Sequence, residues 1–308
     1  MSKQGGKPDL SKLTTERANP ASANLDLKSS LQIARVINSE DAKVARAVKR
    51  ALPQIACAID EIAASLKRGG RLIYVGTGTS GRMGALDSAE CPPTFQTDPR
   101  MVQYVIAGGL KALGQAVEAD EDSREFGAKE IAKKKPGRND VVVGIAASGR
   151  TPFTIAAVEY ARRHGARTVA VTCNPNSELG SVAEIAIVAE VGPEVVSGST
   201  RMKAGTAQKM VLNMLTTGAM TRLGYVYGNL MVNVKLKNSK LAERGITILQ
   251  RATKASRQQS ERALRASANS VPIAMVMLQS GVGRAKAEEL LEKTRGHVRN
   301  AILAGKKP

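Results

Sequence analysis

The chain has 308 residues, which suits one large domain or two modest ones and allows a substantial hydrophobic core. Hydrophobic residues make up 43% of the sequence and charged residues 24%, a composition that excludes a mostly disordered protein. The first residues form no apolar signal core and no run approaches about 18 apolar residues, so neither secretion nor membrane spanning is supported. We therefore expect a cytoplasmic protein.

The formal net charge of +19 raises the question of a nucleic-acid or membrane partner. Residues 235–308 carry 16 Lys or Arg against 5 Asp or Glu, so much of the excess belongs to one end of the chain. Aromatic residues reach only 3%, which disfavours a protein that stacks bases on exposed rings. The pattern is typical of a solvated basic helical surface, and we expect no nucleic acid and no membrane as partner.

Metal-binding side chains are scarce. The three cysteines are far apart and show no Cys-x-x-Cys spacing, which predicts neither a disulfide framework nor a zinc site. With only two histidines, a metal site would need mainly carboxylates, and catalysis would rely on Glu, Asp or Lys. The residues concerned are Cys57, Cys91, Cys173, His164 and His297.

Helical and strand patterns follow one another along the chain. Residues 1–20 are polar with little periodic apolarity, which predicts a flexible N-terminal segment. Residues 41–67 place apolar side chains at helical spacing, which predicts one helix, or two that are separated near Pro53. Five apolar runs of strand length come next, mostly separated by helical patterns, at 72–75, 102–106, 141–145, 168–172 and 185–189.

Strands that alternate with helices indicate a parallel sheet covered on both faces. We expect an α/β fold with a doubly wound, five-stranded parallel sheet, in a domain of residues 21–240 that ends with a long helix at 201–223. Residues 241–308 are expected to form a small C-terminal helical subdomain. Its part at 260–303 predicts three short helices, with breaks near Pro272, residues 281–283 and Gly296.

Two strands of the predicted sheet continue into loops of one plan. The strand at 72–75 leads into Gly-Thr-Gly-Thr-Ser-Gly-Arg at 76–82, and the strand at 141–145 leads into Ala-Ala-Ser-Gly-Arg-Thr-Pro at 146–152. Loops at the carboxyl ends of parallel strands form the ligand crevice, so both loops could face one anion. Small residues let the backbone approach, hydroxyls donate hydrogen bonds and the following helix presents its positive end, which favours a phosphate.

Other interpretations of these loops stay open. No Gly-Lys-Ser/Thr follows, which disfavours a nucleoside triphosphatase. Gly76, Gly78 and Gly81 satisfy the Gly-x-Gly-x-x-Gly pattern of a dinucleotide site, but the acid expected after the strand at 102–106 is missing. Each loop serine could also be an ordinary helix N-cap, an explanation that is weaker for two parallel loops than for one.

Two glutamates are candidates for acid–base chemistry. Glu90 precedes Cys-Pro-Pro, so the helix opened by Ser80 should end there and place the carboxyl near a negative helix end, which suits a general acid. Glu121 comes just before two residues that can cap a following helix, where an acid tends to stay ionised, which suits a general base. Crowding among neighbouring acids or plain exposure to solvent is the alternative.

A third segment, residues 194–209, places hydroxyls and amides where the helix at 201–223 begins. Either this helix end faces the crevice, or it is an elaborately capped helix packed on the sheet.

Together these segments resemble the sugar isomerase (SIS) phosphosugar-binding domain and, more narrowly, the N-acetylmuramic acid 6-phosphate etherase family. The likeness runs from about residue 14 to residue 302. It rests on six ordered motifs, which are the two loops at 76–82 and 146–152, Glu-Cys-Pro-Pro at 90–93, Glu-Asp-Ser-Arg at 121–124, Cys-Asn-Pro at 173–175 and Ser-Thr-Arg-Met-Lys-Ala-Gly-Thr-Ala-Gln-Lys at 199–209.

The resemblance implies a carbon–oxygen lyase of peptidoglycan recycling that uses no cofactor and no metal. Such an enzyme splits the D-lactyl ether of N-acetylmuramic acid 6-phosphate with water, giving N-acetylglucosamine 6-phosphate and D-lactate. By motif, Glu90 resembles the proton donor to departing lactate and Glu121 the base that removes the C2 proton. The implied partners are this phosphosugar and a second copy of the chain, with isolated monomers inactive. The implied phosphate-binding residues are Thr79, Ser80, Ser148, Gly149 and Thr151.

Two further functions fit the same fold. An aldose–ketose isomerase would use the phosphate loops and Glu121 but leave Glu90 without a role, and many such enzymes need a ring-opening histidine that this sequence scarcely offers. A non-catalytic sugar-phosphate sensor resembling glucokinase regulatory protein typically has a second SIS domain, whereas one copy is predicted here. Fold alone does not decide among the three.

Overall fold

The computed structural model describes residues 14–117, 120–234, 236 and 239–306. The chain forms two compact units, one of residues 1–87 with 102–215 and one of residues 88–101 with 216–308. No helix in the described ranges is long and apolar enough to cross a membrane. The domain boundaries at residues 20 and 240 remain predictions of the sequence.

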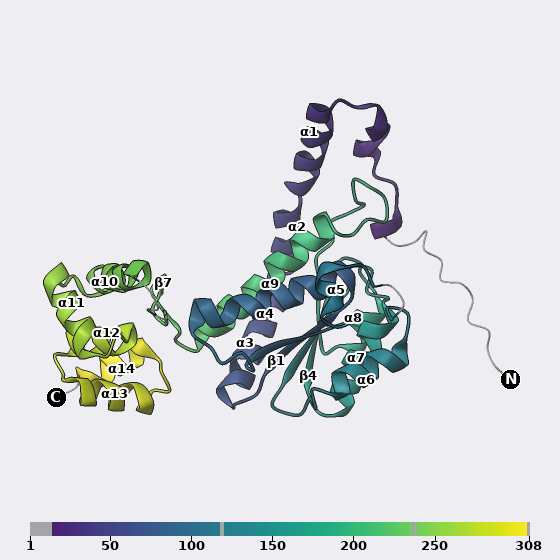
Figure 1. Cartoon of the computed structure of the whole chain (residues 1–308). Helices are drawn as coiled ribbons and strands as arrows, with labels where there is room; N and C mark the ends of the chain where they lie inside the picture. The colour runs from purple at the N-terminus through teal and green to yellow at the C-terminus, as the bar shows by residue number, and fades with distance from the viewer. Residues whose placement is uncertain (1–13, 118–119, 235, 237–238, 307–308) are drawn as a thin grey trace. The chain divides into compact units, whose positions relative to one another are not determined.

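The first unit is built on a five-stranded parallel sheet (Figure 1). All five strands lie where the apolar runs predict them, and their order in the sheet is β2-β1-β3-β4-β5. The order confirms the predicted α/β fold with a doubly wound sheet. The strands are β1 (Leu72–Gly76), β2 (Val102–Ile106), β3 (Val141–Ile145), β4 (Arg167–Thr172) and β5 (Ile185–Val188).

Helices cover both faces of this sheet. Tyr74 on β1 donates a hydrogen bond to Asp87 of α4 (Gly78–Phe95), over 2.7 Å. Its neighbours Ile73 and Val75 belong to the apolar cluster of α7 (Pro152–Arg163). Because successive side chains of a strand point to opposite faces, α4 and α7 lie on opposite sides of the sheet. The connecting helices are α5 (Lys111–Gly114), α6 (Arg124–Ala132), α8 (Glu178–Val182) and α9 (Lys203–Arg222).

The N-terminal part consists of short helices. The predicted separation near Pro53 falls at Ala51, because a proline fits the first turn of a helix, where its missing N–H is not needed. Residues 1–13 of the predicted flexible segment lie outside the described residues. The elements are three 3₁₀ turns (Thr14–Glu16, Pro20–Ser22 and Leu25–Leu27), α1 (Ser30–Asp41), α2 (Val44–Arg50) and α3 (Leu52–Lys67).

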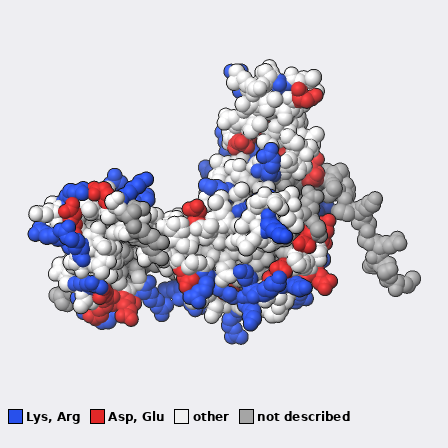
Figure 2. Space-filling model, in the orientation of Figure 1, with Lys and Arg blue, Asp and Glu red and all other residues white. Residues whose placement is uncertain are grey.

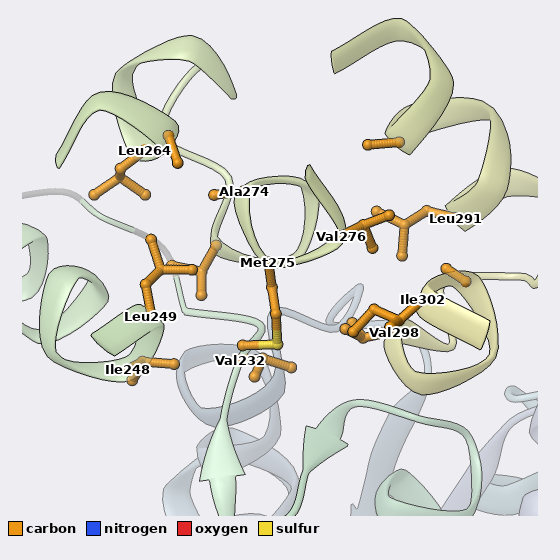
Figure 3. Packing of buried hydrophobic residues seen from close by; sticks show 14 of the residues in the cluster. Val232, Ile248, Leu249, Leu264, Ala274, Met275, Val276, Leu291, Val298 and Ile302 are labelled. Atoms are coloured by element: carbon orange, nitrogen blue, oxygen red, sulfur yellow. The ribbon is translucent and has the colours of Figure 1, made fainter. Parts of the chain in front are cut away.

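The second unit holds a helical bundle with a core of its own (Figure 3). Met275 is fully buried at its centre, and Val232, Leu249 and Val298 from three other segments are fully buried in the same cluster. Breaks lie near Pro272, residues 281–283 and Gly296 as predicted, but they separate four short helices where the sequence predicts three. Pro272 itself lies in the first turn of its helix. The elements are β6 (Val226–Tyr227), β7 (Leu230–Met231), α10 (Ser239–Thr253), α11 (Arg257–Ala266), α12 (Val271–Ser280), α13 (Arg284–Lys293) and α14 (Val298–Gly305).

Lys and Arg are spread over the surfaces of both units, with Asp and Glu among them (Figure 2). In the second unit several of these charges form exposed ion pairs, for example Arg284 with Glu288 and Lys293 with Glu289. Exposed pairs of this kind contribute little to stability and keep a helical surface solvated.

Candidate active site

The two Gly/Ser loops lie side by side at one edge of the sheet. β1 and β3 are neighbours, and Gly76 pairs with Ile145 at their carboxyl ends. From β1 the chain crosses to β2 on one side, and from β3 it crosses to β4 on the other. Ligands of open α/β sheets bind where the strand order reverses in this way. The structure therefore brings together the two loops that the sequence predicts to share one anion.

Glycines make the first loop tight. A Cβ at Gly76 would lie 3.0 Å from the backbone nitrogen of Gly81, and a Cβ at Gly81 would lie 2.6 Å from the side chain of Ile106. No larger residue fits at either position without moving the backbone or a core side chain. Close packing thus explains the first and third glycines of the Gly-x-Gly-x-x-Gly pattern.

The prediction that Ser80 opens a helix is wrong. α4 begins two residues earlier, at Gly78, whose φ of +47° turns the chain sharply after the strand. Ser80 therefore lies within the first turn, where it is not an N-cap. Its buried hydroxyl donates a hydrogen bond to Oε1 of Gln208 on α9, over 3.1 Å, and the half-buried Thr79 precedes it.

The second loop depends on Gly149. Its φ is +67°, and a Cβ there would lie 2.4 Å from Cβ of Ser177. Thr151 takes the N-cap position of α7, yet its side chain makes no capping hydrogen bond to the helix. Ser148 accepts a hydrogen bond from the backbone nitrogen of Arg150, over 3.2 Å. An ordinary capping role accounts for neither Thr151 here nor Ser80 in the first loop.

Glu121 lies beside the second loop. Its carbonyl oxygen accepts a hydrogen bond from the backbone nitrogen of Phe153, in the first turn of α7, over 3.2 Å. Ser123 caps α6 through a hydrogen bond from the backbone nitrogen of Phe126, as the sequence predicts for one of two residues. The Glu121 side chain is half-buried. Its segment is therefore held against the loop that carries Gly149 and Thr151.

The predicted helix end at Glu90 is wrong, because α4 continues through Pro92 and Pro93 to Phe95. A proline removes one helical donor, but the loss is local, and the backbone nitrogen of Gln96 still donates to the carbonyl oxygen of Pro92 over 3.0 Å. Burial of Phe95 holds the last turn in place. Glu90 is exposed on the part of α4 that belongs to the second unit, whereas Glu121 belongs to the first.

The start of α9 is closed by a carboxylate that the sequence analysis did not single out as a cap. Glu194 is fully buried and accepts hydrogen bonds from the backbone nitrogens of Lys203 (3.1 Å) and Ala204 (2.9 Å). Burial raises the pKa of Glu194, and these bonds oppose the rise. Of the two possibilities for residues 194–209, the structure shows the capped helix. Glu194 lies nine residues before the helix, outside any local capping pattern.

Lys203 joins this cap to the N-terminal helices. Its side chain is 1% exposed, and its Nζ lies 2.6 Å from Oε2 of Glu40, which is 3% exposed. Burial raises the pKa of Glu40, but hydrogen bonds from Lys203, Lys43 and Asn19 outweigh it and lower the pKa to about 2. The ion pair therefore fixes the end of α1 against the start of α9.

The Cys-Asn-Pro motif supports the second loop. Nδ2 of Asn174 donates to the carbonyl oxygen of Ala147 over 3.1 Å and to the hydroxyl of Thr15 over 3.2 Å. Burial and the nearby Glu194 raise the pKa of Cys173 to about 12, which keeps the thiol protonated and rules it out as a nucleophile.

An open hollow of about 1160 Å³ borders the second loop, with Ser148 and Arg150 on its wall and Glu16, Ser177 and Glu178 among its other lining residues. Within the part of the chain that the structure describes, no group of three or more His, Cys, Asp or Glu is placed to hold a metal ion.

Comparison with protein families defines the class of fold. A glucokinase regulatory protein N-terminal SIS domain matches residues 54–162, and the SIS domain itself matches residues 133–218. The C-terminal lid domain of glucokinase regulatory protein matches residues 228–269. The first unit is therefore a SIS domain, followed by a helical lid-type domain.

Curated relatives then give the particular family. The chain is 51% identical to the N-acetylmuramic acid 6-phosphate etherase of Klebsiella aerogenes over 96% of this chain and 98% of the relative. It is 49% identical to that of Photorhabdus laumondii over 97% and 99%. The chain belongs to the N-acetylmuramic acid 6-phosphate etherase family. A solved phosphoheptose isomerase from Francisella tularensis is 20% identical, with a TM-score of 0.49 over 63% of this chain and all of that one.

Proposed function

We propose that this protein cleaves the D-lactyl ether of N-acetylmuramic acid 6-phosphate, in the recycling of peptidoglycan. The observation that carries the proposal is identity of about half the residues to curated etherases over nearly the whole chain. A second, independent observation supports the proposal. Two loops with hydroxyl side chains lie together where the strand order reverses, and Thr151 at the start of α7 makes no capping hydrogen bond with its side chain, an arrangement that suits a phosphate.

The substrate phosphate binds between the two loops in this proposal. Ser80, Ser148 and Thr151 donate hydroxyl hydrogen bonds, while Thr79 and Gly149 shape the backbone around the anion. The positive end of α7 adds favourable electrostatics. The Gly149 conformation supports this role, because a side chain there would collide with Ser177.

The chemistry needs one base and one acid. In the open-chain sugar the aldehyde acidifies the C2 proton, which Glu121 removes. The electron pair forms the C2–C3 double bond as the C3–oxygen bond breaks, and Glu90 gives its proton to the departing lactate oxygen. Water then adds, with its oxygen on C3 and a proton on C2, so the net reaction is hydrolysis of the ether. Positioned acid–base groups contribute about 10²–10⁴-fold each.

The working form in this proposal is a cytoplasmic homodimer that uses no cofactor. Sites of SIS domains are often completed by a neighbouring subunit, so separated monomers are expected to be inactive. An assay coupled to sedimentation tests this, because activity that sediments as a monomer would contradict the dimer proposal.

The direct test is to incubate the purified protein with N-acetylmuramic acid 6-phosphate and assay free D-lactate. Release of lactate by the wild type, lost in Glu90→Ala, would support the etherase reaction and the role of Glu90. Folded protein that releases no lactate but forms a ketose phosphate from an aldose phosphate would instead favour an isomerase.

A further inference from the structure

Gln208 carries a buried polar group that the fold leaves unsatisfied. Its side chain is 1% exposed, and its Oε1 accepts the hydroxyl hydrogen of Ser80. The Nε2 nitrogen of the same amide carries two hydrogens that can be donated, and it has no hydrogen-bond partner among the described residues. An unpaired buried donor is destabilising, so its retention beside the first loop needs an explanation.

The face of α9 that carries Gln208 approaches the first loop closely. Gly205 precedes Gln208 by three residues and therefore lies on the same face of the helix. A Cβ at Gly205 would lie 3.3 Å from Cγ2 of Thr79. Gln208 itself contacts Ser80. α9 thus packs against two hydroxyl residues of the loop, against Thr79 through a glycine and against Ser80 through an amide.

The backbone of α9 does not supply the anion contact. Glu194 already occupies the amide hydrogens of Lys203 and Ala204, and a buried carboxylate there repels a second anion. The Gln208 amide, one turn further on, carries the unused donors on this side of the loop. A phosphate offers acceptors, so it can take the Ser80 hydrogen if the Gln208 amide presents a donor to Ser80 in place of its acceptor.

We infer that Gln208 is the positioning residue of the phosphate loop, which sets the Ser80 hydroxyl for the phosphate of the sugar; the inference rests on the proposed function. In the structure the Ser80 hydroxyl donates its hydrogen to Oε1 of Gln208, and while it does so this hydrogen cannot bind a ligand. When phosphate binds, Ser80 donates to a phosphate oxygen, and the amide turns about its soft terminal bond so that Nε2 donates to the Ser80 oxygen. The exchange gives one Nε2 hydrogen a partner in place of the bond to Oε1, and it frees the Ser80 hydrogen.

Two substitutions of similar size test the inference. Gln208→Met removes the polar amide, and Gln208→Glu keeps an acceptor for Ser80 but places negative charge beside the phosphate. Calorimetry with inorganic phosphate and the KM for lactate release are the readouts. We expect Gln208→Met to weaken phosphate binding and raise KM by about 10- to 100-fold, and Gln208→Glu by more than about 100-fold, with kcat within about threefold. Thr217→Ala, at an exposed position of α9, is the matched control.

The outcomes separate the inference from the proposed function. Phosphate affinity and KM within twofold of the wild type in either folded variant would overturn the role of Gln208. A fall in kcat at unchanged phosphate affinity would also overturn it, because Gln208 would then act elsewhere. If the wild type binds phosphate but releases no lactate, the etherase proposal fails, and phosphate calorimetry on the variants still decides the inference. Thermal unfolding identifies a misfolded variant, and the other variant then carries the test.

Discussion

α7 and α9 both begin beside the paired loops, but their N-termini have different roles. At α7 the N-cap residue Thr151 makes no capping hydrogen bond with its side chain, although the backbone nitrogen of Phe153 donates to the carbonyl oxygen of Glu121. At α9 the buried carboxylate of Glu194 accepts hydrogen bonds from the backbone amides of Lys203 and Ala204 and contributes to the stability of the fold. Similar sequences rich in hydroxyl residues therefore form the proposed phosphate site in one case and a structural joint in the other.

The capped end of α9 is also tied into the fold by buried charges. Glu194, Lys203 and Glu40 form a buried chain of charges that connects α9 to α1. Removing one partner of such a pair leaves an uncompensated buried charge, which is strongly destabilising. Changes at α7 and its loop should thus appear in binding and catalysis, and changes at the start of α9 in stability.

The largest effect is expected at the two glutamates proposed to act on substrate held by the open loops. Glu90→Gln and Glu121→Gln should each lower lactate release by about 10²–10⁴-fold, because a positioned proton donor or acceptor is lost. The variants differ in deuterium oxide: Glu90→Gln should still exchange the C2 proton of the substrate, and Glu121→Gln should not. Nuclear magnetic resonance of the sugar measures this, with Glu288→Gln on α13 as the control. Exchange that persists in Glu121→Gln would remove Glu121 as the base.

The next largest effect is on stability, at the ion pair of Glu40 with Lys203 near the start of α9, and it depends on pH. Because the folded pKa of Glu40 is about 2 against an ordinary value of 4.5, its contribution to stability is complete above about pH 5 and is lost as the pH falls toward 2. The shift corresponds to about 3 kcal/mol. Glu40→Gln should lower the free energy of unfolding at pH 7 by about 3–5 kcal/mol, since Lys203 loses its partner, and should flatten the acid dependence.

Urea unfolding at pH 7, 4 and 2.5 measures both changes in Glu40→Gln. Glu288→Gln breaks an exposed pair and should stay within about 0.5 kcal/mol of the wild type. An unchanged acid dependence in Glu40→Gln would show that other carboxyl groups govern acid unfolding.

Much of the fold could be predicted from the sequence, because the five strand runs are mostly apolar, of strand length and largely separated by helical patterns. The open loops could be predicted as well, since their Ser-Gly-Arg repeat is local. The end of α4 could not: the rule that proline ends a helix was overridden by the buried Phe95 beyond it. Nor could the pairs of Glu194 with the start of α9 and of Gln208 with Ser80, which join distant segments and leave no periodic pattern.

Glu194→Gln sharpens the contrast between the two helix starts. An amide offers one acceptor where the carboxylate offers two, and its NH₂ group would face a helix amide, so the free energy of unfolding should fall by about 1–3 kcal/mol. KM for the phosphosugar should stay within twofold, because the closed end takes no part in binding. Urea unfolding and lactate-release kinetics give the two numbers. A rise in KM that matches weaker binding of inorganic phosphate would show that the two helix ends form one site.

The smallest effect is expected when serine is replaced by alanine at two positions, Ser148 in the second loop and Ser256 at the N-cap of α11. Ser148→Ala removes a hydroxyl proposed to contact phosphate and the bond that it accepts from the backbone nitrogen of Arg150. KM should rise about 10-fold, and the free energy of unfolding should fall by no more than about 1 kcal/mol. Ser256→Ala removes the N-cap of α11, whose hydroxyl accepts from the backbone nitrogen of Gln259, and should cost about 1 kcal/mol of stability without changing KM. Because the two changes delete the same atom, opposite responses in KM and stability isolate what the surroundings of each hydroxyl contribute. If Ser148→Ala instead loses stability at constant KM, the second loop is a structural turn and the phosphate must bind elsewhere.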